Sequence, residues 1–173
     1  MIIANYLANN TDLDKVWIVV SPQNPFKEKK SLAKDSDRLH LVNLAIGDNL
    51  KLKASNIEFD LPQPSYTVDT LAFLTEKHPE KEFVLIMGGD NLKSLHKWKN
   101  YEYILKHHEI YVYKRPSYEL GELHDHPSVK ILDAPLMQIS ASYIRKEIRE
   151  KRSVRYLVPD AVFDYLEKTT LYK

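Results

Sequence analysis

Cysteine is absent from this chain of 173 residues, and glycine occurs only four times. The absence of cysteine excludes a disulfide scaffold, thiolate zinc sites and cysteine nucleophiles, and it is compatible with a cytoplasmic location. The few glycines cannot form the GxGxxG loop or the GxxxxGK[ST] loop that cradle phosphates in two widespread folds. No apolar run approaches the roughly 20 residues that span a bilayer, so we expect no membrane partner.

Charge of either sign is not in excess, because 25 lysine and arginine residues face 24 acidic residues. A protein devoted to duplex DNA normally shows a basic excess, so we expect no nucleic-acid partner. The 43% of apolar and 28% of charged residues are typical of an ordinary globular protein. A chain of this length can bury a core unaided, and we expect a single domain over residues 1–173. The sequence does not indicate an oligomeric state.

Short apolar runs alternate with amphipathic segments along the whole chain. The apolar runs predict strands at 15–21, 51–59, 82–87, 109–113 and 129–132. The segments between and after them predict helices, two of which end the chain at 140–150 and 159–167. This alternation predicts an α/β fold with a parallel, doubly wound sheet and C-terminal helices. The run at 82–87 is apolar almost throughout, so we expect it to be a central strand.

The turn after that run is the first candidate site, because ligands of such sheets bind at the carboxyl ends of the strands. Gly88 and Gly89 would let the backbone approach a ligand closely. Asp90 could accept hydrogen bonds from ribose hydroxyls. The alternative is a plain turn from strand to helix in which Asp90 only caps the helix.

Two hydroxyls and an arginine mark a second candidate at the start of a C-terminal helix. Ser140 and Ser142 would lie beside unpaired N–H groups, where the positive end of the helix dipole favours an anion. The guanidinium of Arg145 could fold back to the same phosphate. The alternative is a serine that merely caps the helix and an arginine that lies in solvent.

Two further segments complete the candidates. Thr67 could cap a helix whose N–H groups point at the same edge, and Trp98 could stack on a planar ring. The alternatives are a capped helix after a proline turn and a partly buried core tryptophan. Lysines within 27–34 could approach a polyphosphate or be solvated, whereas the histidines at 107–108 and 124–126 lack zinc-ligand spacing. Jointly these segments indicate a nucleotide site without a resident metal.

Several stretches resemble bacterial nicotinate-nucleotide adenylyltransferases, members of the nucleotidylyltransferase superfamily with a Rossmann-like fold. ISASYIR belongs to a superfamily signature, and SYTVDTL together with GGDNL and HKW is specific to the nicotinate/nicotinamide branch. The resemblance runs from residue 1 to about Tyr165, with Ser117 a minor departure because the family often has glycine there. The matching stretches are SPQNPFK (21–27), DRLHLVNLAI (37–46), LPQPSYTVDTL (61–71), LIMGGDNL (85–92), LHKWKNYEYIL (95–105), YKRPSY (113–118), ISASYIR (139–145) and VRYLVP (154–159).

The resemblance implies adenylyl transfer from ATP to nicotinate mononucleotide, which gives nicotinate adenine dinucleotide and pyrophosphate in NAD biosynthesis. The mononucleotide phosphate attacks the α-phosphorus of ATP directly, with Mg²⁺ helping, so the protein positions anions and neutralises charge. The residues implied at the ATP site are Ser140, Ser142, Arg145, Gly88 and Asp90. Those implied at the mononucleotide site are Tyr66, Thr67 and Trp98.

The large departure from the family is the absence of its GxFxPxHxGH turn, whose two histidines stabilise the transferring phosphoryl group. None of the 7 histidines stands in this arrangement, so we assign no catalytic residue and expect little or no turnover. Residues 1–6 match the helix that follows that turn, and we expect the chain to begin at an internal methionine of a longer protein. We also expect an interruption of the sheet beside residues 15–21. The alternatives are a non-catalytic nucleotide-binding relative and a transferase that acts on nicotinamide mononucleotide.

Overall fold

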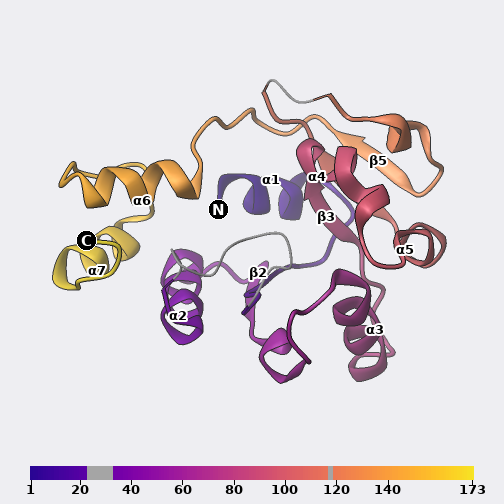
Figure 1. Ribbon diagram of the computed structural model, residues 1–173, viewed down its shortest axis with the longest axis horizontal. Helices are drawn as coiled ribbons and strands as arrows, with labels where there is room; N and C mark the ends of the chain where they lie inside the picture. Colours follow the sequence, from indigo (N-terminus) through magenta and orange to yellow (C-terminus); the bar gives the residue numbers. More distant parts are fainter. Residues whose placement is uncertain (23–32, 117–118) are drawn as a thin grey trace. The chain divides into compact units, whose positions relative to one another are not determined.

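Parallel strands alternate with helices in the computed structural model, which describes residues 1–22, 33–116 and 119–173 (Figure 1). The described residues divide into two units. The first unit contains residues 1–21, 33–56 and 138–173, and the second contains residues 22, 57–116 and 119–137. The lysine-rich loop up to residue 32 and Ser117 lie outside the described residues.

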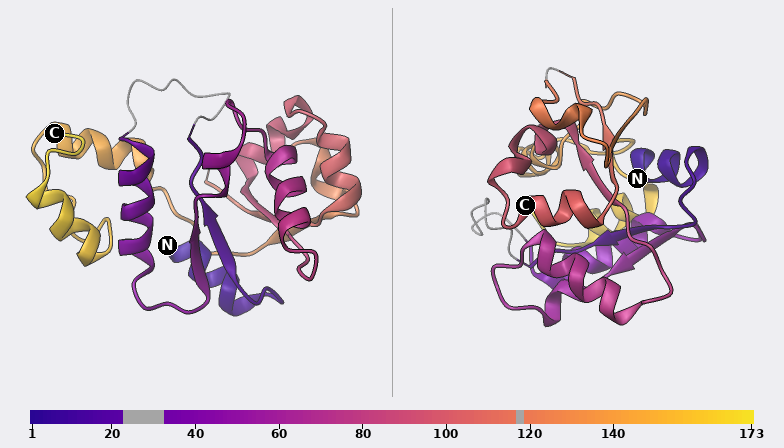
Figure 2. Two further views of the ribbon diagram at one scale, coloured as in Figure 1. Left: turned by 90° about the horizontal axis from the view of Figure 1, so that it is seen from below. Right: turned by 90° about the vertical axis from the view of Figure 1, so that its right-hand side faces the viewer.

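The first unit contains a two-stranded parallel sheet of β1 (Val16–Val19) and β2 (Leu52–Ser55), which lie side by side in Figure 2. Helix α2 (Asp35–Ile46) lies between the two strands in the chain, and α1 (Ile2–Asn10) packs against both. Both predicted strands are confirmed. The second is shorter than expected, because residues Ile57–Asp60 form a turn of 3₁₀-helix, η2, in the second unit.

The two predicted C-terminal helices, α6 (Ala141–Arg149) and α7 (Asp160–Lys168), also belong to the first unit. Figure 1 shows them at the C-terminal end of the chain, and α7 packs against α2. Their apolar faces meet in a small buried cluster formed by Ile148, Val154, Val162 and Leu166. This cluster joins α6 and α7 to α2, whose Leu41 and Leu44 pack against it.

An ion pair joins the last turns of α6 to the turn that follows the helix. The buried carboxylate of Glu147 accepts hydrogen bonds from Arg152 Nε at 2.7 Å and from Arg152 Nη2 at 2.6 Å. These hydrogen bonds hold the pKa of Glu147 below its ordinary value. The stability that the pair contributes is therefore fully present above the ordinary glutamate pKa of about 4.3, and it is lost as the pH falls through the lowered pKa.

Replacing Arg152 with glutamine should consequently lower the melting temperature more at about pH 6 than at about pH 3, where protonation of Glu147 already weakens the pair. Thermal denaturation of both proteins across this range measures the difference. Lys168→Gln is the matched control, because it removes one positive charge from an exposed position at the end of α7 in the same unit. An Arg152→Gln effect that is the same at both pH values would contradict the prediction.

The second unit contains a three-stranded sheet in which every neighbour is parallel, in the order β3-β4-β5. The strands are β3 (Leu85–Gly88), β4 (Ile110–Tyr113) and β5 (Val129–Leu132). The helical elements of this unit are η2, α3 (Thr67–Lys77), α4 (Gly89–Ser94), η3 (Leu95–Lys97), α5 (Tyr101–His107) and η4 (Glu122–Asp125). The middle strand of this sheet is β4, not the strand predicted at 82–87. The first three residues of β4 are buried, whereas Leu85 and Ile86 of β3 are only partly buried.

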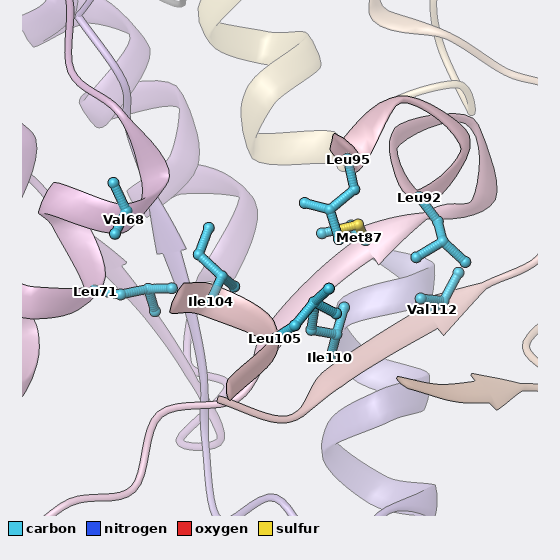
Figure 3. Packing of buried hydrophobic residues seen from close by; sticks show 9 residues of the cluster. All are labelled: Val68, Leu71, Met87, Leu92, Leu95, Ile104, Leu105, Ile110 and Val112. Atoms are coloured by element: carbon cyan, nitrogen blue, oxygen red, sulfur yellow. The ribbon is translucent and has the colours of Figure 1, made fainter. Parts of the chain in front are cut away.

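Buried side chains from six elements form the core of the second unit (Figure 3). Leu95 and Ile104 are completely buried, and so are Ile110 and Val112 of the middle strand. The full cluster consists of Val68, Leu71, Met87, Leu92, Leu95, Ile104, Leu105, Ile110 and Val112. It fixes α3, α4, η3 and α5 against the sheet, and these elements carry the candidate residues described below.

The predicted α/β class with parallel strands is confirmed. Among the described residues, the strands form two sheets, β1-β2 and β3-β4-β5, rather than one continuous sheet, in agreement with the interruption expected beside residues 15–21. Within the described parts of the chain, no helix is both long enough and apolar enough to cross a membrane.

Candidate functional site

The turn after β3 carries an ion pair. Gly88 is the N-cap of α4, and Asp90 lies inside the first turn of the helix, so the alternative in which Asp90 caps the helix is wrong. Arg115 Nη1 donates to Asp90 Oδ2 at 2.8 Å, and both side chains are partly buried. Asp90 Oδ1 is buried and has no hydrogen-bond partner within the described residues. A buried acceptor that has no partner is suited to a hydrogen-bond donor from a ligand, such as a ribose hydroxyl.

The missing side chain of Gly88 makes room for this ion pair. A Cβ atom at position 88 would lie 2.5 Å from Asp90 Oδ1 and 2.9 Å from Arg115 Cδ. At Gly89, a Cβ atom would lie 2.9 Å from a methyl group of Leu120. The sequence predicted that these glycines admit a ligand to the backbone, but the space beside them is filled by side chains of this chain.

Tyr113 extends the polar cluster at the carboxyl ends of β3 and β4. It pairs with Gly88 in the parallel register, so both residues lie where α/β sheets bind their ligands. Burial raises the pKa of Tyr113, the positive charge of Arg115 opposes this rise and the negative charge of Asp90 adds to it. Tyr113 therefore offers an uncharged hydroxyl beside the charged pair at neutral pH.

Tyr66 and Trp98 both lie, half-buried, against the core cluster of the second unit. Tyr66 is the N-cap of α3 and makes no side-chain capping bond, and Thr67 is the first helical residue rather than the predicted cap. Lys99, next to Trp98, links the two segments: its Nζ donates to Asp69 Oδ2 at 2.9 Å and lies 4.7 Å from the centre of the Tyr66 ring. The structure thus brings the candidates for the mononucleotide together around one cluster.

Ser140, Ser142 and Arg145 lie together at the start of α6, in the first unit. Ser140 caps the helix, because its Oγ accepts from the backbone N–H of Tyr143 at 3.1 Å. Arg145 Nη2 donates to Ser142 Oγ at 3.2 Å, and its guanidinium lies 6.0 Å from the ring centre of Tyr172. The two hydroxyls and the guanidinium thus lie within the first one and a half turns at the start of α6, as the spacing predicted. The helix cap made by Ser140 is also part of the alternative stated for this segment.

The residues for a resident metal ion are missing from the described ranges, which hold no group of three or more histidine, aspartate or glutamate side chains able to bind one. A magnesium site usually needs only one or two carboxylates when substrate phosphates supply further oxygens. The residues that the structure describes therefore provide no dedicated metal cage.

Three residues of this site were missed by the sequence analysis. Arg115 directly follows the end of β4, so the rule about carboxyl ends of strands could have found it. The ammonium of Lys99 and the buried carboxylate of Glu58, which bonds to Ser65 and Thr70, left no signal in the sequence pattern. Their partners lie 7 to 30 residues away along the chain.

Comparisons with known proteins identify the family. A model of cytidylyltransferase-like proteins matches residues 1–147. Probable nicotinate-nucleotide adenylyltransferases of Flavobacterium psychrophilum and Cytophaga hutchinsonii are 52% and 49% identical over 100% and 99% of this chain, which covers 91% and 90% of their lengths. The chain belongs to the nicotinate-nucleotide adenylyltransferase family. The resemblance stated from the sequence motifs is thereby confirmed.

Solved structures of this kind have the same fold. The nicotinic acid mononucleotide adenylyltransferase of Plasmodium falciparum, complexed with NaAD, aligns with a TM-score of 0.76 at 18% identity. The alignment covers 99% of this chain and 88% of that one. A putative nicotinate-nucleotide adenylyltransferase of Vibrio parahaemolyticus aligns with a TM-score of 0.70 at 17% identity, covering 96% and 87%. The Rossmann-like α/β class is therefore confirmed.

Proposed function

We propose that residues 1–173 act as a nucleotidylyltransferase-like domain that binds ATP and nicotinate mononucleotide for adenylyl transfer in NAD biosynthesis. The observation that carries the proposal is an identity of 52% to a probable nicotinate-nucleotide adenylyltransferase over the whole chain. In this reaction a phosphate oxygen of the mononucleotide forms a bond to the α-phosphorus of ATP. The bond between the α-phosphorus and the bridging oxygen breaks, and pyrophosphate leaves with the electron pair.

The proposed roles of the residues follow from their chemistry. Ser140, Ser142 and Arg145 offer hydroxyl and guanidinium donors of the kind that bind phosphate oxygens. The partnerless Oδ1 of Asp90 is suited to accept a hydrogen bond from the adenosine, and the missing side chain of Gly88 leaves room for the Asp90–Arg115 pair that holds this carboxylate. We propose that a divalent cation, Mg²⁺, enters on the ATP phosphates and neutralises part of their charge.

The mononucleotide is assigned to the group formed by Tyr66, Thr67 and Trp98. Tyr66 and Trp98 present half-buried aromatic rings, which are suited to a planar pyridine ring. The positive charge of Lys99 beside Tyr66 favours the acid over the amide form of the ring substituent, although Asp69 neutralises part of it. We propose a cytoplasmic location, with which the absence of cysteine is compatible.

Isothermal titration of the purified chain with ATP, nicotinate mononucleotide and nicotinamide mononucleotide tests the proposal. We expect ATP and the acid to bind with dissociation constants between about 1 μM and 1 mM, the usual range of enzyme substrates. Arg115→Met should weaken ATP binding by about tenfold, because it removes a charge-assisted hydrogen bond from Asp90.

Lys114→Met is the matched control for this experiment. It removes a neighbouring positive charge whose exposed partner, Asp133, lies at 3.2 Å, and it should leave ATP binding unchanged. A wild-type chain that binds neither ATP nor nicotinate mononucleotide would contradict the proposed function. Preferential binding of nicotinamide mononucleotide would favour the amide-specific transferase instead.

A further inference from the structure

A buried carboxylate lies behind the turn that precedes α3. Glu58, in η2, is only 9% exposed, and both of its carboxylate oxygens accept hydrogen bonds. Ser65 Oγ donates to Oε2 at 2.6 Å, and Thr70 Oγ1 donates to Oε1 at 2.9 Å. Ser65 and Thr70 are themselves buried. One side chain thus joins three parts of the second unit: η2, the turn and the first turns of α3.

Burying a carboxylate is unfavourable unless strong partners replace its hydration, and two neutral hydroxyls are modest partners. A well-packed apolar residue would stabilise this position at least as well. The hydrogen bonds instead fix geometry, because they hold the chain on both sides of Tyr66 and Thr67. Thr70 Oγ1 also lies 3.2 Å from the carbonyl oxygen of Tyr66, which accepts from the backbone N–H of Thr70 at 3.0 Å.

We propose that Glu58 is a positioning residue for nicotinate mononucleotide. By fixing Ser65 and Thr70, its carboxylate sets the direction in which Tyr66 and Thr67 are presented to the pyridine nucleotide. This inference rests on the proposed function and assigns to it a residue that does not itself touch the substrate. Misplacement of substrate-contacting groups by as little as 1 Å has large effects on binding and reaction, so a buried positioning group is valuable there.

The test measures affinity for nicotinate mononucleotide and for ATP separately, by titration calorimetry of the whole chain. Glu58→Gln keeps the size of the side chain but cannot accept from both hydroxyls with both of its terminal atoms. We expect it to weaken mononucleotide binding by about tenfold and to change ATP binding less than about twofold. Glu76→Gln, at an exposed position further along α3, should bind both ligands as the wild type does.

A second pair of variants keeps the proposal testable if Glu58→Gln does not fold. Thr70→Val preserves the shape of the side chain and removes the hydroxyl, whereas Thr70→Ser retains the hydroxyl. We expect Thr70→Val to weaken mononucleotide binding about fivefold and Thr70→Ser to restore most of the loss.

Three outcomes would overturn the inference. Unchanged mononucleotide binding in Glu58→Gln or in Thr70→Val would show that the hydroxyl contacts do not position the site. Equal losses for ATP and the mononucleotide would show a general structural role. Equal binding by Thr70→Val and Thr70→Ser would exclude the hydrogen bond as the cause. Failure of the wild-type chain to bind the mononucleotide is a different result, because it rejects the proposed function before any variant is compared.

Discussion

The purified 173-residue chain is expected to form nicotinate adenine dinucleotide at least about 100-fold more slowly than family members that carry the GxFxPxHxGH turn. The resemblance implies that two histidines in that turn stabilise the transferring phosphoryl group, and none of the 7 histidines of this chain has that arrangement. Removing one preorganised donor to a developing charge typically slows catalysis by about 10²–10³. Chromatographic detection of the dinucleotide, together with release of pyrophosphate, measures the rate.

A gain-of-function experiment tests directly whether the two histidines of that turn account for the difference in rate. The chain is joined to a segment that ends in the GxFxPxHxGH pattern ahead of Met1, and the matched control carries alanine at both histidines of that segment. The histidine form should accelerate the reaction, whereas the alanine form should remain close to the unextended chain. Turnover by the unextended chain at an ordinary enzyme rate, about 1–10³ per second, would show that the prediction is wrong.

Leu95→Ala is expected to lower the free energy of unfolding of the second unit by about 2–5 kcal/mol. Leu95 of η3 is completely buried in the core cluster (Figure 3), and the half-buried Trp98 packs against the same cluster. The substitution removes apolar contacts and leaves a cavity that the surrounding helices close only in part. Urea denaturation followed by the fluorescence of Trp98, in a Trp17→Phe background, reports on this unit.

Leu136→Ala is the matched control, because Leu136 belongs to the same unit. Leu136 is 63% exposed, so the same change there should alter the free energy of unfolding by less than about 0.5 kcal/mol. Similar losses at positions 136 and 95 would contradict the assignment of Leu95 to the core. A loss at Leu95 of less than about 1 kcal/mol would do the same, because completely buried leucines are worth more.

The bounds of helices and strands were predicted well where the pattern of neighbouring residues determines them. The strand Val129–Leu132 has the bounds that the apolar pattern indicated, and the helix Ala141–Arg149 lies within the predicted range 140–150. The position of a strand within its sheet was not predictable in the same way. The run at 82–87 is more apolar than the run at 109–113, yet β4 occupies the middle of its sheet. Which strand is covered on both sides depends on pairing between distant segments, and periodicity along the chain does not contain that information.

The candidate site was predictable in its parts and not in its contacts. Ser142 and Arg145 interact over three residues, and Ser140 caps the same helix, so spacing along the chain alone placed these side chains close together. Asp90 was predicted as a ribose acceptor or a helix cap. Its ion pair with Arg115, 25 residues away, depends on the parallel pairing of β3 with β4. Glu58 was not predicted for the same reason, since only the folded turn brings it to Ser65 and Thr70.

The crowding at Gly88 has a consequence for how sequences of this kind diverge. Positions 88, 90 and 115 share one small volume, because a side chain at position 88 would occupy the space of the Asp90 carboxylate and the Arg115 stem. The effect of a substitution at any one of these positions therefore depends on the residues at the other two. A larger residue fits at position 88 only if the side chains at positions 90 and 115 are shorter or adopt other conformations. The three positions are therefore expected to change together in evolution.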